Sequence, residues 1–145
     1  MSEIRNHVRI HAPKSAVYRA LTTEDGVRGW WNRRARISPD VGGESTYQFN
    51  KGGEDVHMRF ENEKLDPQGK VVWRCLSNDN KSWLGTRVEW TLDDAGGDTE
   101  VAFLHHGFAQ EFDGTDGYRM VTGGWEHFLQ SLKGWTEEKH GQPFE

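Results

Sequence analysis

The chain has 145 residues, the length of one domain, and its formal net charge is −5. Only 34% of the residues are hydrophobic, but 12% are aromatic, and buried Trp and Phe side chains supply enough apolar area for a core. This composition excludes a disordered chain. The one basic cluster, residues 33–36, is interpreted as the solvated start of a strand, so the sequence does not predict nucleic-acid binding.

Cysteine content and the first residues bear on location. Cys75 is the only cysteine, so no disulfide can form within the chain, which fits a reducing cytoplasm. Residues 1–9 contain no apolar segment of the kind that a secretory signal requires, and no stretch approaches the length of a membrane span. We therefore expect a single cytoplasmic domain over residues 1–145, with no membrane partner.

The first third of the chain alternates between strand and helix signals. Apolar residues at every second or fourth position of residues 4–10 predict a strand with one buried face. Pro13 opens a helix expected over residues 14–21, because proline is tolerated in a first helical turn. Thr22 or Thr23 can cap a second short helix that ends near residues 30–31.

Alternating residues separated by turn segments predict a meander in the middle of the chain. Its six strands are expected over residues 34–38, 44–50, 56–61, 70–76, 86–92 and 99–106. Gly, Pro, Asn and Asp dominate the segments between them, including residues 39–43, 51–53, 66–69 and 93–97.

The last helix carries a broad apolar stripe. At about 100° per residue its apolar positions fall within an arc of roughly 120°, so they face one partner. They are Val121, Trp125, Phe128, Leu129, Leu132 and Trp135, while Glu126, Gln130, Lys133 and Glu137 turn away. This order of elements predicts an α+β helix-grip fold: a curved antiparallel sheet wraps on the long C-terminal helix, and the two short helices close one end.

Motifs for common chemistries are absent from the sequence. It has no phosphate-binding loop, no dinucleotide fingerprint, no H-E-x-x-H and no nucleophile elbow. His105 and His106 are adjacent on a strand, so they point to opposite faces and cannot both ligate one metal. We expect no metal and no cofactor, and whether the protein is an enzyme stays open.

Strand parity points to a ligand cavity, because residues two apart face the same side of a sheet. Aromatic sets on several strands would meet the helix stripe and surround any space between the two layers. The predicted cavity residues are Trp30, Trp31, Tyr47, Phe49, Met58, Trp73, Trp90, Phe103, His105, Trp125, Phe128 and Leu129. We expect His105 near the mouth, where it would bond a ligand or act as general base. Alternatively, it is a core histidine bonded to a backbone carbonyl.

Several short motifs resemble one known family. Residues 22–31 read TTEDGVRGWW, and landmarks follow in order as VGGE at 41–44, VWRC at 72–75, WLGTRV at 83–88, HHGF at 105–108 and GWEHFLQSLK at 124–133. Together they resemble the bacterial START-like (SRPBCC) proteins, and within these the subgroup related to the activator of the ninety-kilodalton heat-shock chaperone's ATPase. The resemblance implies a helix-grip fold with a deep cavity between sheet and long helix. That superfamily includes lipid carriers, hormone receptors, cyclases and chaperone activators.

From these patterns we expect a stand-alone START-like domain that binds a small hydrophobic or amphipathic molecule in its cavity. One alternative is a co-chaperone-type interaction module with a chaperone as partner. Another is a cyclase- or hydrolase-like enzyme that uses the cavity with His105 as base. The protein would be a monomer or a homodimer.

Overall fold

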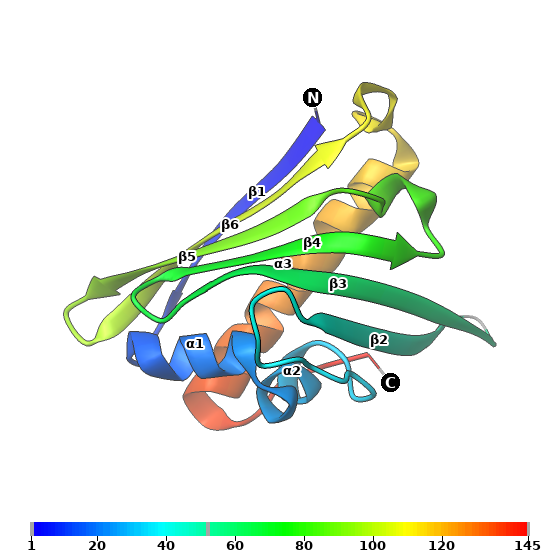
Figure 1. The fold of residues 1–145 in the computed structure, drawn as a ribbon. Helices are drawn as coiled ribbons and strands as arrows, with labels where there is room; N and C mark the ends of the chain where they lie inside the picture. Colours follow the sequence, from blue (N-terminus) through cyan, green and yellow to red (C-terminus); the bar gives the residue numbers. More distant parts are fainter. Residues whose placement is uncertain (1, 52, 145) are drawn as a thin grey trace.

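The structure, a computed structural model, describes residues 2–51 and 53–144. Within these residues an antiparallel sheet of six strands has the order β1-β6-β5-β4-β3-β2. The elements are β1 (Ser2–Ile10), α1 (Lys14–Thr22), α2 (Glu24–Trp30), β2 (Glu44–Lys51), β3 (Glu54–Asp66), β4 (Lys70–Asn78), η1 (Lys81–Trp83), β5 (Arg87–Ala95), β6 (Asp98–Phe108), η2 (Gln110–Phe112) and α3 (Asp116–Glu138). Helix α3 runs obliquely across one face of the sheet, and α1 and α2 pack beside its second half (Figure 1).

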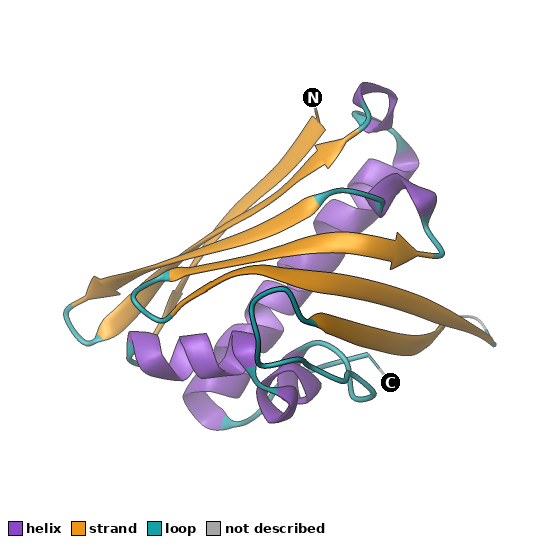
Figure 2. Ribbon diagram, in the orientation of Figure 1, coloured by secondary structure: helices purple, strands orange, loops and turns teal. Residues whose placement is uncertain are grey.

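Both short helices form as the sequence predicts. Pro13 precedes the first residue of α1. Thr23 caps α2: its Oγ1 accepts a hydrogen bond of 3.1 Å from the backbone N–H of Gly26. The 3-10 turns η1 and η2 lie at the other end of the molecule, near the first half of α3 (Figure 2). Helices α1 and α2 therefore close one end of the space between the sheet and α3, and the two 3-10 turns lie at the other end.

Curvature of the sheet has a local cause in β3. Its pairing with β4 shifts register between Arg59 and Phe60 and again between Asn62 and Lys64. Such bulges bend a strand and increase its twist. The hairpin of β5 and β6 turns at Gly96 and Gly97, whose φ angles of 66° and 97° suit glycine.

The strand predicted over residues 34–38 is wrong. Only Arg36 makes a bridge there, with Thr46, and the rest of the segment is a loop held by side chains. Arg28 Nε donates to the carbonyl of Ala35 at 2.8 Å, and Asn62 Nδ2 donates to the carbonyl of Ser38 at 2.8 Å. Because side chains satisfy these carbonyls, the segment needs no strand partner. Of the predicted turn at 51–53, residue 52 lies outside the described residues.

The apolar stripe of α3 faces the sheet. Its buried side chains include Trp125, Phe128, Leu129 and Leu132, whereas Val121 is half-buried. Glu126 and Gln130 are exposed, as predicted. The prediction for Lys133 is wrong, because its ammonium reaches back to the carbonyl of Arg9 at 2.7 Å and half-buries the side chain.

Among the helices in the described part of the chain, none has both the length and the apolar character to cross a lipid bilayer.

Candidate functional site

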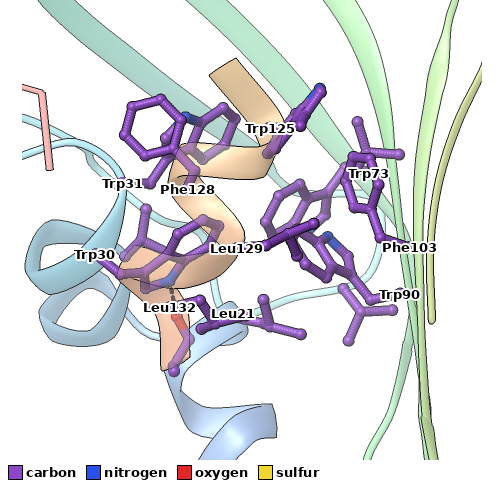
Figure 3. Close-up of a cluster of buried hydrophobic side chains, with 14 of the residues drawn as sticks. Leu21, Trp30, Trp31, Trp73, Trp90, Phe103, Trp125, Phe128, Leu129 and Leu132 are labelled. Atoms are coloured by element: carbon purple, nitrogen blue, oxygen red, sulfur yellow. Dashed lines mark hydrogen bonds between the residues drawn. The ribbon is translucent and has the colours of Figure 1, made fainter. Parts of the chain in front are cut away.

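Aromatic rings fill the middle of the space between sheet and helix. Figure 3 shows side chains from α2, α3 and the strands pointing toward one another. The rings of Trp31 and Trp73 are nearly parallel, with centres 5.6 Å apart. The ring centres of Phe103 and Trp125 are 4.6 Å apart. Trp90 meets Phe103 edge to face at 4.9 Å. This part of the interior is packed core.

A partly open pocket of about 480 Å³ lies beside this core. It sits where β3 begins and β4 ends, under the first half of α3. Its lining comprises Trp31, Val56, Met58, Asn78, Asp79, Asn80, Trp83, Met120, Val121, Gly124, Trp125, Phe128 and Phe144. The volume and the mainly apolar, aromatic lining are typical of small-molecule sites.

The predicted cavity residues divide between pocket and core. The pocket is lined by Trp31, Met58, Trp125 and Phe128. Seven others are buried but do not line it: Trp30, Tyr47, Trp73, Trp90, Phe103, His105 and Leu129. The side chain of Phe49 lies outside the described part of the structure. A ligand-binding role for the lining residues stays a prediction.

Gly124 gives the pocket part of its depth. A Cβ atom added to Gly124 would meet nothing within 4 Å, so the absence of a side chain leaves open space on the helix surface. Gly123, the preceding residue, also has open space around it, but it is exposed and does not line the pocket. A side chain at position 124 would therefore extend into the pocket, whereas one at position 123 would extend into solvent.

Sequence reasoning missed the residues that come from turns and from the tail. Trp83 lies in η1, which Asn80 caps by accepting a hydrogen bond of 3.1 Å from the N–H of Ser82. Phe144 is tied to the short helices: its N–H donates to the carbonyl of Trp31 at 2.8 Å. Its ring lies 4.7 Å from that of Phe128. Periodicity could not find these two residues, because neither belongs to a regular strand or helix pattern.

His105 is not at the mouth, so that expectation is wrong. It is fully buried, because β6 continues to Phe108, whose ring centre lies 4.4 Å from the imidazole. Trp83 covers the imidazole on another side, with ring centres 4.6 Å apart. Burial, with a smaller contribution from the neighbouring His106, lowers the pKa of His105 to about 3. The imidazole is therefore neutral.

The hydrogen bonds of His105 assign its tautomer. Trp125 donates its indole N–H to Nδ1 at 3.0 Å, so Nδ1 is the acceptor and the proton resides on Nε2. Nε2 in turn donates to Thr86 Oγ1 at 2.9 Å, and the Thr86 hydroxyl donates to the carbonyl of Trp83 at 2.6 Å. His105 thus holds two indoles of the pocket wall in place without touching the pocket itself.

Among the described residues, the buried thiol and the metal-ligating side chains form neither a reactive group nor a metal cluster. The Cys75 thiol is buried, which raises its pKa to about 11 and keeps it protonated. Within residues 2–51 and 53–144 no group of three or more His, Cys, Asp or Glu side chains is placed to hold a metal ion.

Comparisons with known proteins agree with this fold. The model of the Activator of Hsp90 ATPase homolog 1-like protein family matches residues 11–137. The Aha1 dimer from Colwellia psychrerythraea is 32% identical, with a TM-score of 0.79, over 97% of this chain and 100% of that one. None of the curated proteins matches.

More distant structures share the fold alone. The AHSA1-like protein from Aeromonas hydrophila is 17% identical, with a TM-score of 0.70, over 97% of this chain and 99% of that one. CalU16 from Micromonospora echinospora is 18% identical, with a TM-score of 0.69, over 92% of this chain and 73% of that one. On the extent of the family match and the identity to the Colwellia protein, the chain belongs to the Activator of Hsp90 ATPase homolog 1-like family of the START-like (SRPBCC) superfamily.

Proposed function

We propose that this protein binds a small hydrophobic or amphipathic molecule in the pocket between β3, β4 and α3. One observation carries the proposal: the pocket of about 480 Å³ has walls of Trp, Phe and Met side chains and opens to the surface. A solvated apolar surface of this kind is unfavourable unless something covers it, and a small molecule that fills it removes that surface from water.

The wall is also held ready for a ligand. Trp125 is fixed by its hydrogen bond to His105, and Trp83 packs against the same imidazole. Walls that are already ordered lose little conformational entropy when a ligand binds, which favours affinity. Met58 and Met120 supply adaptable apolar surface around these rings, and Val121 adds a stiffer apolar side chain.

The neutral probe N-phenyl-1-naphthylamine tests the proposal, because its emission rises in apolar surroundings. We expect saturable binding of one probe per chain. We also expect reduced tryptophan emission through energy transfer, since Trp31, Trp83 and Trp125 line the pocket. Absence of saturable binding would contradict the proposal. Native mass spectrometry of protein from its own host then identifies the natural ligand.

A co-chaperone role is the second candidate, favoured by the family to which the chain belongs. The similar Colwellia protein is an Aha1 dimer, so a homodimer and a chaperone partner are both to be tested for this chain. The large exposed hydrophobic residues of the described chain are Val41, Leu84, Met120 and Phe144, and none lies on a strand. Stimulation of an Hsp90 ATPase by the purified protein would support this role, and size-exclusion chromatography with light scattering would report the oligomeric state.

The enzyme alternative with His105 as base receives no support from the geometry. A general base must reach the substrate, whereas both ring nitrogens of His105 are engaged inside the core. We propose a binding domain over residues 1–145 that acts in the cytoplasm. Fractionation of host cells with an antibody to the protein tests this location.

A further inference from the structure

The polar part of the pocket wall comes from a single short segment. Asn78, Asp79 and Asn80 follow one another where β4 ends, and the other lining residues are hydrophobic, aromatic or glycine. A ligand that fills the pocket therefore meets carboxylate and amide groups at one corner only. That arrangement suits an amphiphile with one head group, and the chemistry of the corner decides which head group.

Hydrogen bonding within the segment leaves specific atoms unused. Asn78 Oδ1 accepts from the N–H of Asn80 at 2.8 Å, and Asn80 Oδ1 accepts from Ser82. Asp79 Oδ2 accepts from the N–H of His57 at 3.2 Å. Among the described residues, the two amide NH₂ groups and Asp79 Oδ1 have no hydrogen-bond partner. Asn78 is only 4% exposed, so a ligand is well placed to satisfy its NH₂ group.

The corner of the pocket formed by residues 78–80 carries negative charge. Asp79 is the charged residue of the lining, and no Lys, Arg or His belongs to it. Within the described part of the chain, Asp79 makes no ion pair. Asp79 is exposed, so water weakens its repulsion of an anionic head group, but no cation of the lining offsets that repulsion. A cation there would gain both the carboxylate and the faces of neighbouring indoles.

We propose that the pocket selects amphiphiles whose head group is a hydroxyl or a protonated amine and rejects those with a carboxylate or a phosphate. The inference rests on the proposed binding function. A hydroxyl or ammonium group donates to Asp79 Oδ1, and a hydroxyl also accepts from the NH₂ group of Asn78. A carboxylate can use the amide donors but is repelled by Asp79.

Three probes with one apolar body test this selectivity: 2-naphthol, 2-naphthylmethylamine and 2-naphthoate. Isothermal titration calorimetry at pH 7 gives the Kd of each. We expect the alcohol and the amine to bind at least about tenfold more tightly than the acid. In Asp79→Asn the amine should lose most of its advantage, and the acid should gain affinity. Asn at this position keeps an oxygen that can accept from His57.

Asp93→Asn is the matched control, since Asp93 is exposed on β5 and does not line the pocket. It removes the same charge and should leave all three affinities unchanged. If the acid binds as tightly as the others, or if the two Asp variants behave alike, the head-group inference is refuted while binding stands. If neither these probes nor N-phenyl-1-naphthylamine bind, the proposed function itself fails.

Discussion

Replacing His105 by Gln should make the stability of this protein less dependent on pH. Gln has an acceptor for the indole N–H of Trp125 and a donor for Thr86, but it does not titrate. In the native protein, burial keeps His105 neutral down to about pH 3. In the unfolded chain the same imidazole takes up a proton near its ordinary pKa of 6.5.

The sign of the effect follows from proton uptake. Below pH 6.5 the unfolded state binds a proton at His105 and the folded state does not, so acid favours unfolding. Each pH unit below 6.5 lowers the free energy of unfolding by about 1.4 kcal/mol, until the folded state also takes up the proton near pH 3. At pH 5 the loss amounts to about 2 kcal/mol.

Urea unfolding followed by tryptophan fluorescence at pH 7 and pH 5 measures this loss. The carboxylates of Glu89, Asp98 and Glu137 have lowered pKa values and also lose stabilisation in acid, but they are shared by both proteins. The native protein should therefore lose about 2 kcal/mol more than His105→Gln between the two pH values. Equal losses would refute the assignment of a buried, neutral His105.

Two further predictions concern packing around the helices. Trp125→Ala should lower the free energy of unfolding by about 3–5 kcal/mol, because the indole is 2% exposed and ringed by aromatic side chains. Trp125→Phe, which mainly removes the donor to His105, should lower the free energy of unfolding by about 1–3 kcal/mol in urea unfolding. If Trp125→Phe lost as much as Trp125→Ala, the separate contribution of aromatic packing would be contradicted. Gly29→Ala should destabilise by about 1–3 kcal/mol in thermal unfolding, since its Cβ would lie 2.4 Å from the Trp135 ring. Gly123→Ala is the control: its Cβ lies in open space, so this variant should be more stable than the native protein by about 0.5–1 kcal/mol. An increase in stability for Gly29→Ala would contradict the prediction.

Periodicity was sufficient for most of the fold. The stripe of Trp125, Phe128, Leu129 and Leu132 identified the face of α3 that meets the sheet, because burial along a helix follows its repeat. It failed over residues 34–38, where the basic residues were interpreted as a strand. There the backbone is held by the side chains of Arg28, seven residues from Ala35, and of Asn62, 24 residues from Ser38, and the alternation of residues along a strand does not report such contacts.

The pocket could be predicted only in part. Strand parity gives the side of the sheet that a residue faces, but not whether opposing rings touch or leave space. Trp73, Trp90 and Phe103 face inward as expected, and they meet rings from α2 and α3 instead of bordering a void. Beyond Trp31 and Trp125, where Gly124 has no side chain, space remains for the pocket. Two further parts of the pocket wall come from η1 and from the C-terminal segment at Phe144. The alternation of residues along a strand makes no prediction for such segments.

The most direct test of ligand binding compares Gly124→Leu with Gly123→Leu. Both substitutions introduce the same side chain on α3 where a Cβ meets nothing within 4 Å, but only Gly124 lines the pocket. Titration with N-phenyl-1-naphthylamine should show that Gly123→Leu binds like the native protein, whereas Gly124→Leu loses at least about tenfold in affinity because leucine occupies the ligand's space. Unchanged binding in Gly124→Leu would contradict the account that this pocket is the ligand site.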